Sequence, residues 1–351
     1  MTRFVSLMLL AGVILLGVVI AETDLERAAL LVRELGLSGI GLVLAIYFAG
    51  FVVLTGSWLV TLPSVAISSR WLYRLWKVLM VGSALDSVTP LAGIGGEPVK
   101  AAMLKRLYGI AYREGVSSLV LTRMTDLIAQ VIFISIGFAL MFGEEPFPEG
   151  FRWAAGAGLV AFSLAIGLFF LAQRKRGFSW LRGRLEGGWL NRILGARAQQ
   201  ALTALKDVED RLVGFYWGER ARFGASVALA FADWMASAVA TYLAIRLLGF
   251  TIGFGDALAI EAFVVLVRSV FFFVPADIGT QDAALVLVCE AVTGSAPLGL
   301  ALAVLRRIRD IGFIAWGLGI GWAHSLGPRS MARAALREKQ EAASEVRAEG
   351  P

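Results

Sequence analysis

Long blocks of apolar residues dominate this chain of 351 residues. A helix needs roughly 20 apolar residues to cross the hydrocarbon core of a bilayer. The chain has 58% hydrophobic and only 17% charged residues, so it is far more apolar than a soluble domain. The sequence therefore predicts an all-α polytopic membrane protein with about six transmembrane helices, at Phe4 to Ala21, Gly39 to Leu62, Leu127 to Phe142, Trp153 to Ala172, Phe223 to Leu248 and Leu298 to His324.

Two shorter apolar pieces, Leu72 to Val88 and Ala257 to Val274, each lead into a run rich in Gly and Pro. The first run is Thr89 to Lys100, and the second is Val274 to Asp282. Pro removes a backbone donor and Gly permits unusual dihedrals, so both runs should break a helix. Irregular backbone at membrane depth survives only under protein or beside a watery cavity. We expect two re-entrant helical hairpins here; ordinary polar loops and pairs of full crossings are the alternatives.

The charges between the apolar blocks predict the orientation of the chain, because cytoplasmic loops are enriched in Lys and Arg. The stretch Glu22 to Leu37 and the stretch Gly143 to Gly150 are acidic and read as outer loops. Basic residues gather near Arg74 and Lys105, between 174 and 197, and in the tail after Pro328. We expect both termini in the cytoplasm and a location in the plasma (inner) membrane of a prokaryote.

An offset of 184 residues brings similar residues together, including Ile94-Gly95 with Ile278-Gly279, Arg123 with Arg307, and Asp126 with Asp310. An odd number of crossings separates the two copies, which indicates an inverted repeat like that of many secondary transporters. The predicted organisation is an N-terminal span and outer loop (1–37), repeat 1 (38–142, with its motif at 89–100), span 4 and a basic cytoplasmic loop with an amphipathic helix (143–221), repeat 2 (222–324, with its motif at 274–282) and a polar tail (325–351).

An Arg-x-x-Asp pair occurs once in each repeat, within an apolar helix. Each such charge costs at least about 2.5–3.5 kcal/mol at mid-membrane, so these pairs require an explanation. The first explanation is that each pair is a structural ion pair that holds helices together. The second is that the Arg guanidinium binds a lipid phosphate while the carboxylate holds the guanidinium in place. The candidate substrate-binding residues are Pro90, Gly95, Gly96, Glu97, Lys100, Arg123, Asp126, Arg268, Pro275, Asp277, Gly279, Gln281, Asp282, Arg307 and Asp310.

Other kinds of site find little support in the composition. Cys289 is the only cysteine and His324 the only histidine, which argues against a disulfide, a thiolate cluster or a multi-histidine metal site. No Ser-His or Cys-His arrangement can activate a nucleophile. The net charge of +6 is spread over loops without a nucleic-acid-binding motif. We therefore expect no catalytic residue, no metal, no cofactor and no nucleic-acid partner.

From about residue 40 to residue 324 the chain resembles the lysylphosphatidylglycerol synthase transmembrane region family, also described as flippase-like membrane proteins. The resemblance rests on Gly95-Gly96-Glu97 with Lys100, Arg123 with Asp126, the run Pro275 to Asp282, and Arg307 with Asp310. The chain departs from the family in having Lys100 where Arg is frequent, Pro275-Ala276-Asp277 where Pro-Gly-Gly is frequent, and Asp282 where Glu is usual. The run Arg306 to Asp310 and Gln281-Asp282 also look similar to hopanoid-associated members.

The resemblance implies a lipid-handling membrane module, which some members fuse to a cytoplasmic aminoacyl-transferase. No comparable domain follows the last span in this sequence, so we expect the chain to move or present a lipid rather than synthesise one. Membrane lipids with an anionic or phosphate-bearing head group are the expected partners, with lipid-biosynthesis enzymes as further candidates. The alternatives are a membrane-embedded enzyme acting on a lipid head group, with Glu97 or Asp282 as acid or base, and a non-catalytic scaffold of a lipid-biosynthesis complex.

Overall fold

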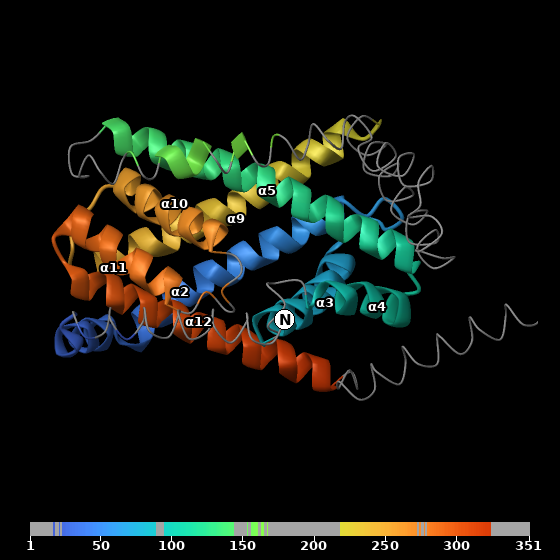
Figure 1. The fold of residues 1–351 in the computed structure, drawn as a ribbon. Helices are drawn as coiled ribbons and strands as arrows, with labels where there is room; N and C mark the ends of the chain where they lie inside the picture. Colours follow the sequence, from blue (N-terminus) through green and yellow to red (C-terminus); the bar gives the residue numbers. More distant parts are fainter. Residues whose placement is uncertain are drawn as a thin grey trace, which may run out of the picture.

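The computed structural model describes residues 23–88, 95–143, 218–271 and 279–323, with scattered positions at 17, 21, 153, 156–160, 163–164, 167, 274 and 277. Within these ranges every regular element is a helix, so the predicted all-α fold is confirmed there (Figure 1). The helices are α2 (Leu25–Val60), α3 (Ser69–Val88), α4 (Glu97–Tyr108), α5 (Tyr112–Gly143), α9 (Arg220–Leu247), α10 (Phe254–Val270), α11 (Thr280–Thr293) and α12 (Ala296–Ala323).

Three of these helices are long and apolar enough to cross a membrane: α2, α9 and the part of α5 from Tyr112 to Met141. The chain is therefore a membrane protein by the character of its helices as well as by composition. Helix α12 spans 28 residues, but it carries Arg306, Arg307, Arg309 and Asp310 in its middle. The expected spans at 4–21 and 153–172 lie mostly outside the described residues, and the amphipathic helix at 196–217 and the polar tail lie wholly outside them.

The acidic stretch Glu22 to Leu37, expected to be a loop, is helical from Leu25 onward. The side chain of Asp24 caps this helix by accepting a hydrogen bond of 3.0 Å from the backbone N–H of Arg27. Residues 25 to 35 are mostly good helix formers, which explains why charge alone does not open a loop here. The helix is broken instead at Gly36, whose φ of 64° and ψ of 173° are not helical.

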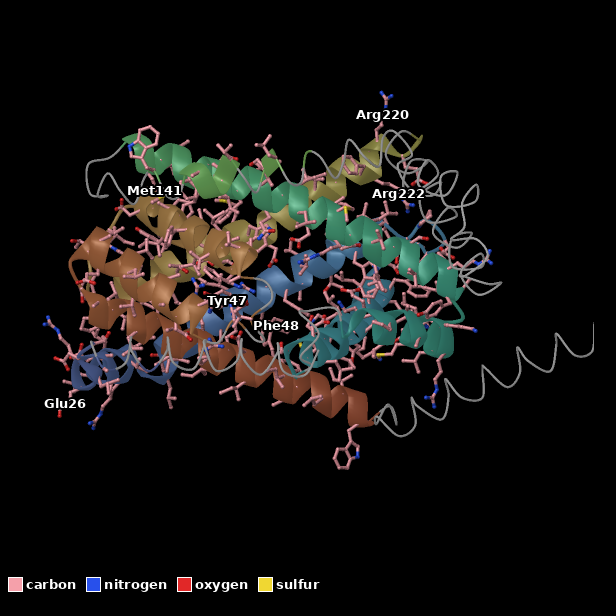
Figure 2. All side chains as sticks on the ribbon, viewed as in Figure 1. Glu26, Tyr47, Phe48, Met141, Arg220 and Arg222 are labelled. Carbon is pink, nitrogen blue, oxygen red and sulfur yellow. The ribbon has the colours of Figure 1, made fainter. Side chains whose placement is uncertain are left out.

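The same order of one long, two short and one long helix occurs twice, as α2–α5 and as α9–α12. The long helices α2 and α9 run antiparallel: Ser57, near the end of α2, lies 2.9 Å (Oγ to Oγ) from Ser226, near the start of α9. Figure 2 accordingly shows Glu26, in the first turn of α2, and Arg220, at the start of α9, at opposite ends of the bundle. Corresponding helices of the two units therefore point in opposite directions.

The two units interlock through their short helices. Helix α3 packs on α12 of the other unit, and α10 packs on α5 in the same way. Consequently α3 and α4 lie at one end of the bundle and α10 and α11 at the other (Figure 1). The second short helix of each unit ends at a left-handed glycine, Gly109 after α4 and Gly294 after α11, which are usual helix stops.

Close contact between α3 and α12 depends on Gly317, and this leads to a first prediction. A Cβ atom added at Gly317 would lie 2.4 Å from the backbone oxygen of Met80, whereas one added at Gly319 would meet nothing within 4 Å. We expect Gly317→Ala to lower the free energy of unfolding by about 1–3 kcal/mol through overpacking. Gly319→Ala is the control and should raise it by up to about 1 kcal/mol through helix propensity. SDS-induced unfolding in mixed micelles measures both, and equal values would contradict the tight packing.

Candidate functional site

The first charged group lies where α3 meets the start of α4, and we call it the α4 site. Lys100 is buried, and its Nζ lies 2.7 Å from Oε1 of Glu97 and 3.4 Å from Oδ2 of Asp86. The backbone N–H of Gly96 donates a hydrogen bond of 2.6 Å to Oδ1 of Asp86. One ammonium thus holds two carboxylates.

Glycine is required at the α4 site because the backbones of α3 and α4 approach closely. A Cβ atom at Gly96 would lie 2.1 Å from the carbonyl oxygen of Gly82. A Cβ atom at Gly82 would in turn lie 2.3 Å from Cε of Lys100. Gly96 of the sequence motif therefore allows the N-terminus of α4 to pack closely against α3, and Gly95 lies in the turn before α4.

The second charged group surrounds the start of α11 and is called the α11 site. Arg307 from α12 donates a hydrogen bond of 2.6 Å to Oδ2 of the buried Asp282, in the first turn of α11. Arg268 from the last turn of α10 donates through Nε to Oδ2 of Asp277 at 2.8 Å. Three helices and the segment before α11 therefore supply two Arg–Asp pairs to one place.

The backbone of the α11 site is shaped by residues with positive φ. Gly279 has φ of 81°, and its N–H donates to Oδ2 of Asp282 at 3.1 Å, which caps the helix. Asp277 has φ of 51°, a region that Asp tolerates better than most residues. Its carbonyl oxygen accepts hydrogen bonds from Arg307 at 3.3 Å and from the hydroxyl of Thr280 at 3.3 Å. These bonds fix Asp277 beside the pair formed by Arg307 and Asp282.

A third group, the central cluster, lies between α5 and α9. Arg123 and Asp126 form the ion pair expected from their spacing, at 3.2 Å. The other oxygen of Asp126 accepts a hydrogen bond of 3.1 Å from the indole of Trp234 on α9. Asp126 is shielded, whereas the side chain of Arg123 is 66% exposed and can meet a ligand. Trp234 carried no sequence signal beyond its hydrophobicity.

The second Arg-x-x-Asp motif does not copy the first one. The partner of Arg307 in the structure is Asp282, while Asp310 accepts hydrogen bonds of 2.9 and 2.7 Å from Arg309. The Arg309 guanidinium also stacks over the ring of Tyr47 on α2, 4.5 Å from its centroid. Figure 2 shows Tyr47 in the middle of the bundle. The three arginines of α12 thus face three different neighbours.

Arg306 forms the most deeply buried ion pair of the described residues. It donates to Glu261 of α10, which also accepts a hydrogen bond of 2.7 Å from the hydroxyl of Thr241 on α9. The side chains of Arg306 and Glu261 are 4% and 5% exposed. Neither residue is among the predicted site residues. The available signal was that both charges interrupt apolar helices and must be compensated.

The predicted site residues therefore fall into three groups, and two of them are neighbours, because Arg268 of the α11 site interacts electrostatically with Asp126 of the central cluster. Gly96, Glu97 and Lys100 lie in the α4 site, whereas Arg268, Asp277, Gly279, Asp282 and Arg307 lie in the α11 site. Gln281 is buried in the first turn of α11. Pro90 and Pro275 are outside the described residues. Among the residues that are described, no three His, Cys, Asp or Glu side chains are placed to hold a metal ion.

Comparison with known proteins gives one match. The family model described as "Lysylphosphatidylglycerol synthase TM region" matches residues 4–317, which include all three charged groups. No curated protein and no solved structure shows significant similarity to the chain.

Proposed function

The chain belongs to the lysylphosphatidylglycerol synthase TM region family, and from this premise we propose that it is a lipid translocase of the flippase type. It binds a phosphate-bearing head group between the two antiparallel units and carries it across the plasma membrane of a prokaryote. It does so without covalent chemistry and without a cofactor. The chain has six spans, with α3–α4 and α10–α11 as re-entrant hairpins and both termini in the cytoplasm. Hopanoid-associated members are the proposed subgroup.

The observation that carries this proposal is the unequal burial of the Arg–Asp pairs in the α11 site. The side chain of Asp282 is 3% exposed and that of its partner Arg307 is 28% exposed. Asp277 and Arg268 are 22% and 38% exposed. In both pairs the carboxylate lies deeper and the guanidinium lies nearer the surface. An Arg that is held by a carboxylate and stays partly exposed is oriented so that its guanidinium can bind a phosphate.

The arrangement of the helices supports transport rather than static binding. In secondary transporters with inverted repeats, substrate sites occur at broken helices, where the ends of half-helices face the ligand. Helices α4 and α11 are short, follow a break, and begin at a charged site in each of the two antiparallel units. If the α4 site and the α11 site open in turn to opposite sides of the membrane, a head group can pass from one side to the other. Lipid-biosynthesis enzymes are the proposed source of the lipid.

A flipping assay tests the proposal. The purified chain is reconstituted in vesicles containing a fluorescent phospholipid, and flipping is followed by chemical quenching of the outer leaflet. Arg307→Lys keeps a cation beside Asp282 but loses the planar fork. Loss of one charge-assisted hydrogen bond, worth about 1.5–3 kcal/mol, should slow flipping by roughly 10–100-fold.

Arg222→Lys is the matched control, because Arg222 pairs with Glu219 at 3.1 Å at the far end of α9 (Figure 2). It should flip lipid at the rate of the unmodified chain. Equal rates for Arg307→Lys and Arg222→Lys would refute the assignment of Arg307 to the head group. Absence of flipping by the unmodified chain would refute the translocase itself.

A further inference from the structure

Two adjacent side chains at the start of α11 keep polar atoms without a partner. The amide Nε2 of Gln281 and the carboxylate Oδ1 of Asp282 are buried, and neither has a hydrogen-bond partner in the described part of the chain. Both residues are only 2% exposed. A buried donor or acceptor without a partner is costly, and most proteins pair nearly all of them. Two such atoms on neighbouring residues point to a ligand that supplies the missing bonds.

The unpartnered oxygen of Asp282, Oδ1, requires a hydrogen-bond donor from the ligand. Its other oxygen, Oδ2, already accepts from Arg307 at 2.6 Å and from the N–H of Gly279 at 3.1 Å. These two donors fix the orientation of the carboxylate. Oδ1 therefore presents a fixed acceptor, whereas Nε2 of Gln281 presents a donor.

The chemistry of common head groups selects among ligands. A phosphate oxygen would satisfy Gln281 but repel Asp282, and an ammonium group would satisfy Asp282 but offer nothing to Gln281. Hydroxyl groups both donate and accept, so adjacent hydroxyls satisfy both atoms. Resting on the lipid-binding role proposed above, we infer that the α11 site takes a polyol head group, with one hydroxyl donating to Asp282 and one accepting from Gln281.

The α4 site differs in its unpartnered atoms, which assigns the polyol preference to the α11 site alone. The unpartnered buried atom there is Oε2 of Glu97, an acceptor, and its neighbour Lys100 carries a positive charge. An acceptor alone does not distinguish a hydroxyl from an ammonium. The α11 site is therefore the selective site, and the α4 site tolerates other head groups.

Native mass spectrometry of the full chain tests the inference with four lipids of equal acyl length. Phosphatidylglycerol carries a phosphate and a polyol, a diacylglycerol hexoside carries a polyol alone, phosphatidylethanolamine carries a phosphate and an ammonium, and phosphatidic acid carries a phosphate alone. We expect the two polyol lipids to be retained over the other two by about three- to tenfold, the value of a typical hydrogen bond. If only phosphatidylglycerol is favoured, the polyol comes from a phospholipid; if the hexoside is favoured equally, a glycolipid also fits.

Gln281→Met removes the donor while keeping the length of the side chain. It should abolish the preference for polyol lipids and leave the resistance of the lipid-free chain to unfolding unchanged or higher, because an unpaired buried amide is lost. Gln130→Met is the matched control: Gln130 is also buried, but its Nε2 donates to Ser269 at 2.8 Å. That variant should lower stability and keep the lipid preference.

Equal retention of the four lipids by the unmodified chain, a preference for phosphatidylethanolamine, or an unchanged polyol preference in Gln281→Met would each overturn the inference. Failure of the proposed function has a different signature. If polyol lipids are retained selectively but no lipid is flipped in vesicles, the chain binds polyol lipids without transporting them.

Discussion

Replacing Arg306 by Leu is expected to lower the free energy of unfolding by about 3–5 kcal/mol, the usual cost of breaking a buried ion pair. The variant leaves the carboxylate of Glu261, 5% exposed, without its cationic partner. The hydroxyl of Thr241 still donates to Glu261 at 2.7 Å, but one neutral hydrogen bond does not compensate a buried charge. Because the pair joins α12 to α10, which belong to the same unit, the packing within the unit α9–α12 should loosen. SDS-induced unfolding in mixed micelles measures the loss.

The double variant Arg306→Leu with Glu261→Leu separates the charge effect from the packing effect. Removing both charges should recover most of the lost stability, since buried ion pairs are often no more stabilising than apolar residues of similar size. Arg222→Leu serves as the control, because the pair with Glu219 is partly exposed and such pairs contribute about 0–1 kcal/mol. A double variant as unstable as Arg306→Leu would show that Arg306 stabilises the fold through contacts other than Glu261.

The arginines of α12 illustrate how far sequence reasoning reaches into the candidate site. Their apolar surroundings predict that each must be compensated. Successive residues of a helix project about 100° apart, so Arg306, Arg307 and Arg309 face different neighbours. Spacing along one helix favoured Asp310 as the partner of Arg307, yet Asp282 of α11 binds it. Choosing among acids on other helices requires the tertiary packing, which the sequence pattern does not contain.

The helices themselves were predicted more completely than the site. Apolar block length and the 184-residue offset indicated helical units built around broken segments, and α5 and α12 begin 184 residues apart. The stretch before Gly36 was misread because its charges suggested a loop, although its residues favour a helix. Charge patterning reports the surroundings of a segment, whereas backbone preferences and capping by Asp24 decide its local structure.

Asp282 and Glu97 show why matched positions in the two units need not share chemistry. Each lies in the first turn of the second short helix of its unit. Glu97 binds Lys100, which lies one turn later on the same helix, while Asp282 binds Arg307 of another helix. The first pair can follow its own hairpin, but the second ties the hairpin to α12.

Cysteine labelling should show that the turns after α4 and α11 face opposite sides of the membrane. Cys289 is fully buried and is the only cysteine, so Cys289→Ala gives a clean background. In intact cells, a membrane-impermeant maleimide should label Ser295→Cys directly and label Ala111→Cys only after permeabilisation. The reason is that Lys105, Arg106 and Arg113 flank Ala111 and favour a cytoplasmic location for this turn, whereas the proposed inverted arrangement places Ser295 outside.

The same background distinguishes re-entrant hairpins from full crossings. Ser87 is exposed near the end of α3, close to the expected tip of the first hairpin. A re-entrant tip stops within the bilayer, so Ser87→Cys should resist the impermeant maleimide added from outside, while a full crossing would expose it there. Labelling of Ala111→Cys and Ser295→Cys from the same side would disprove the inverted arrangement. With opposite labelling and a protected Ser87→Cys, α4 and α11 approach the membrane interior from opposite sides, as alternating access requires.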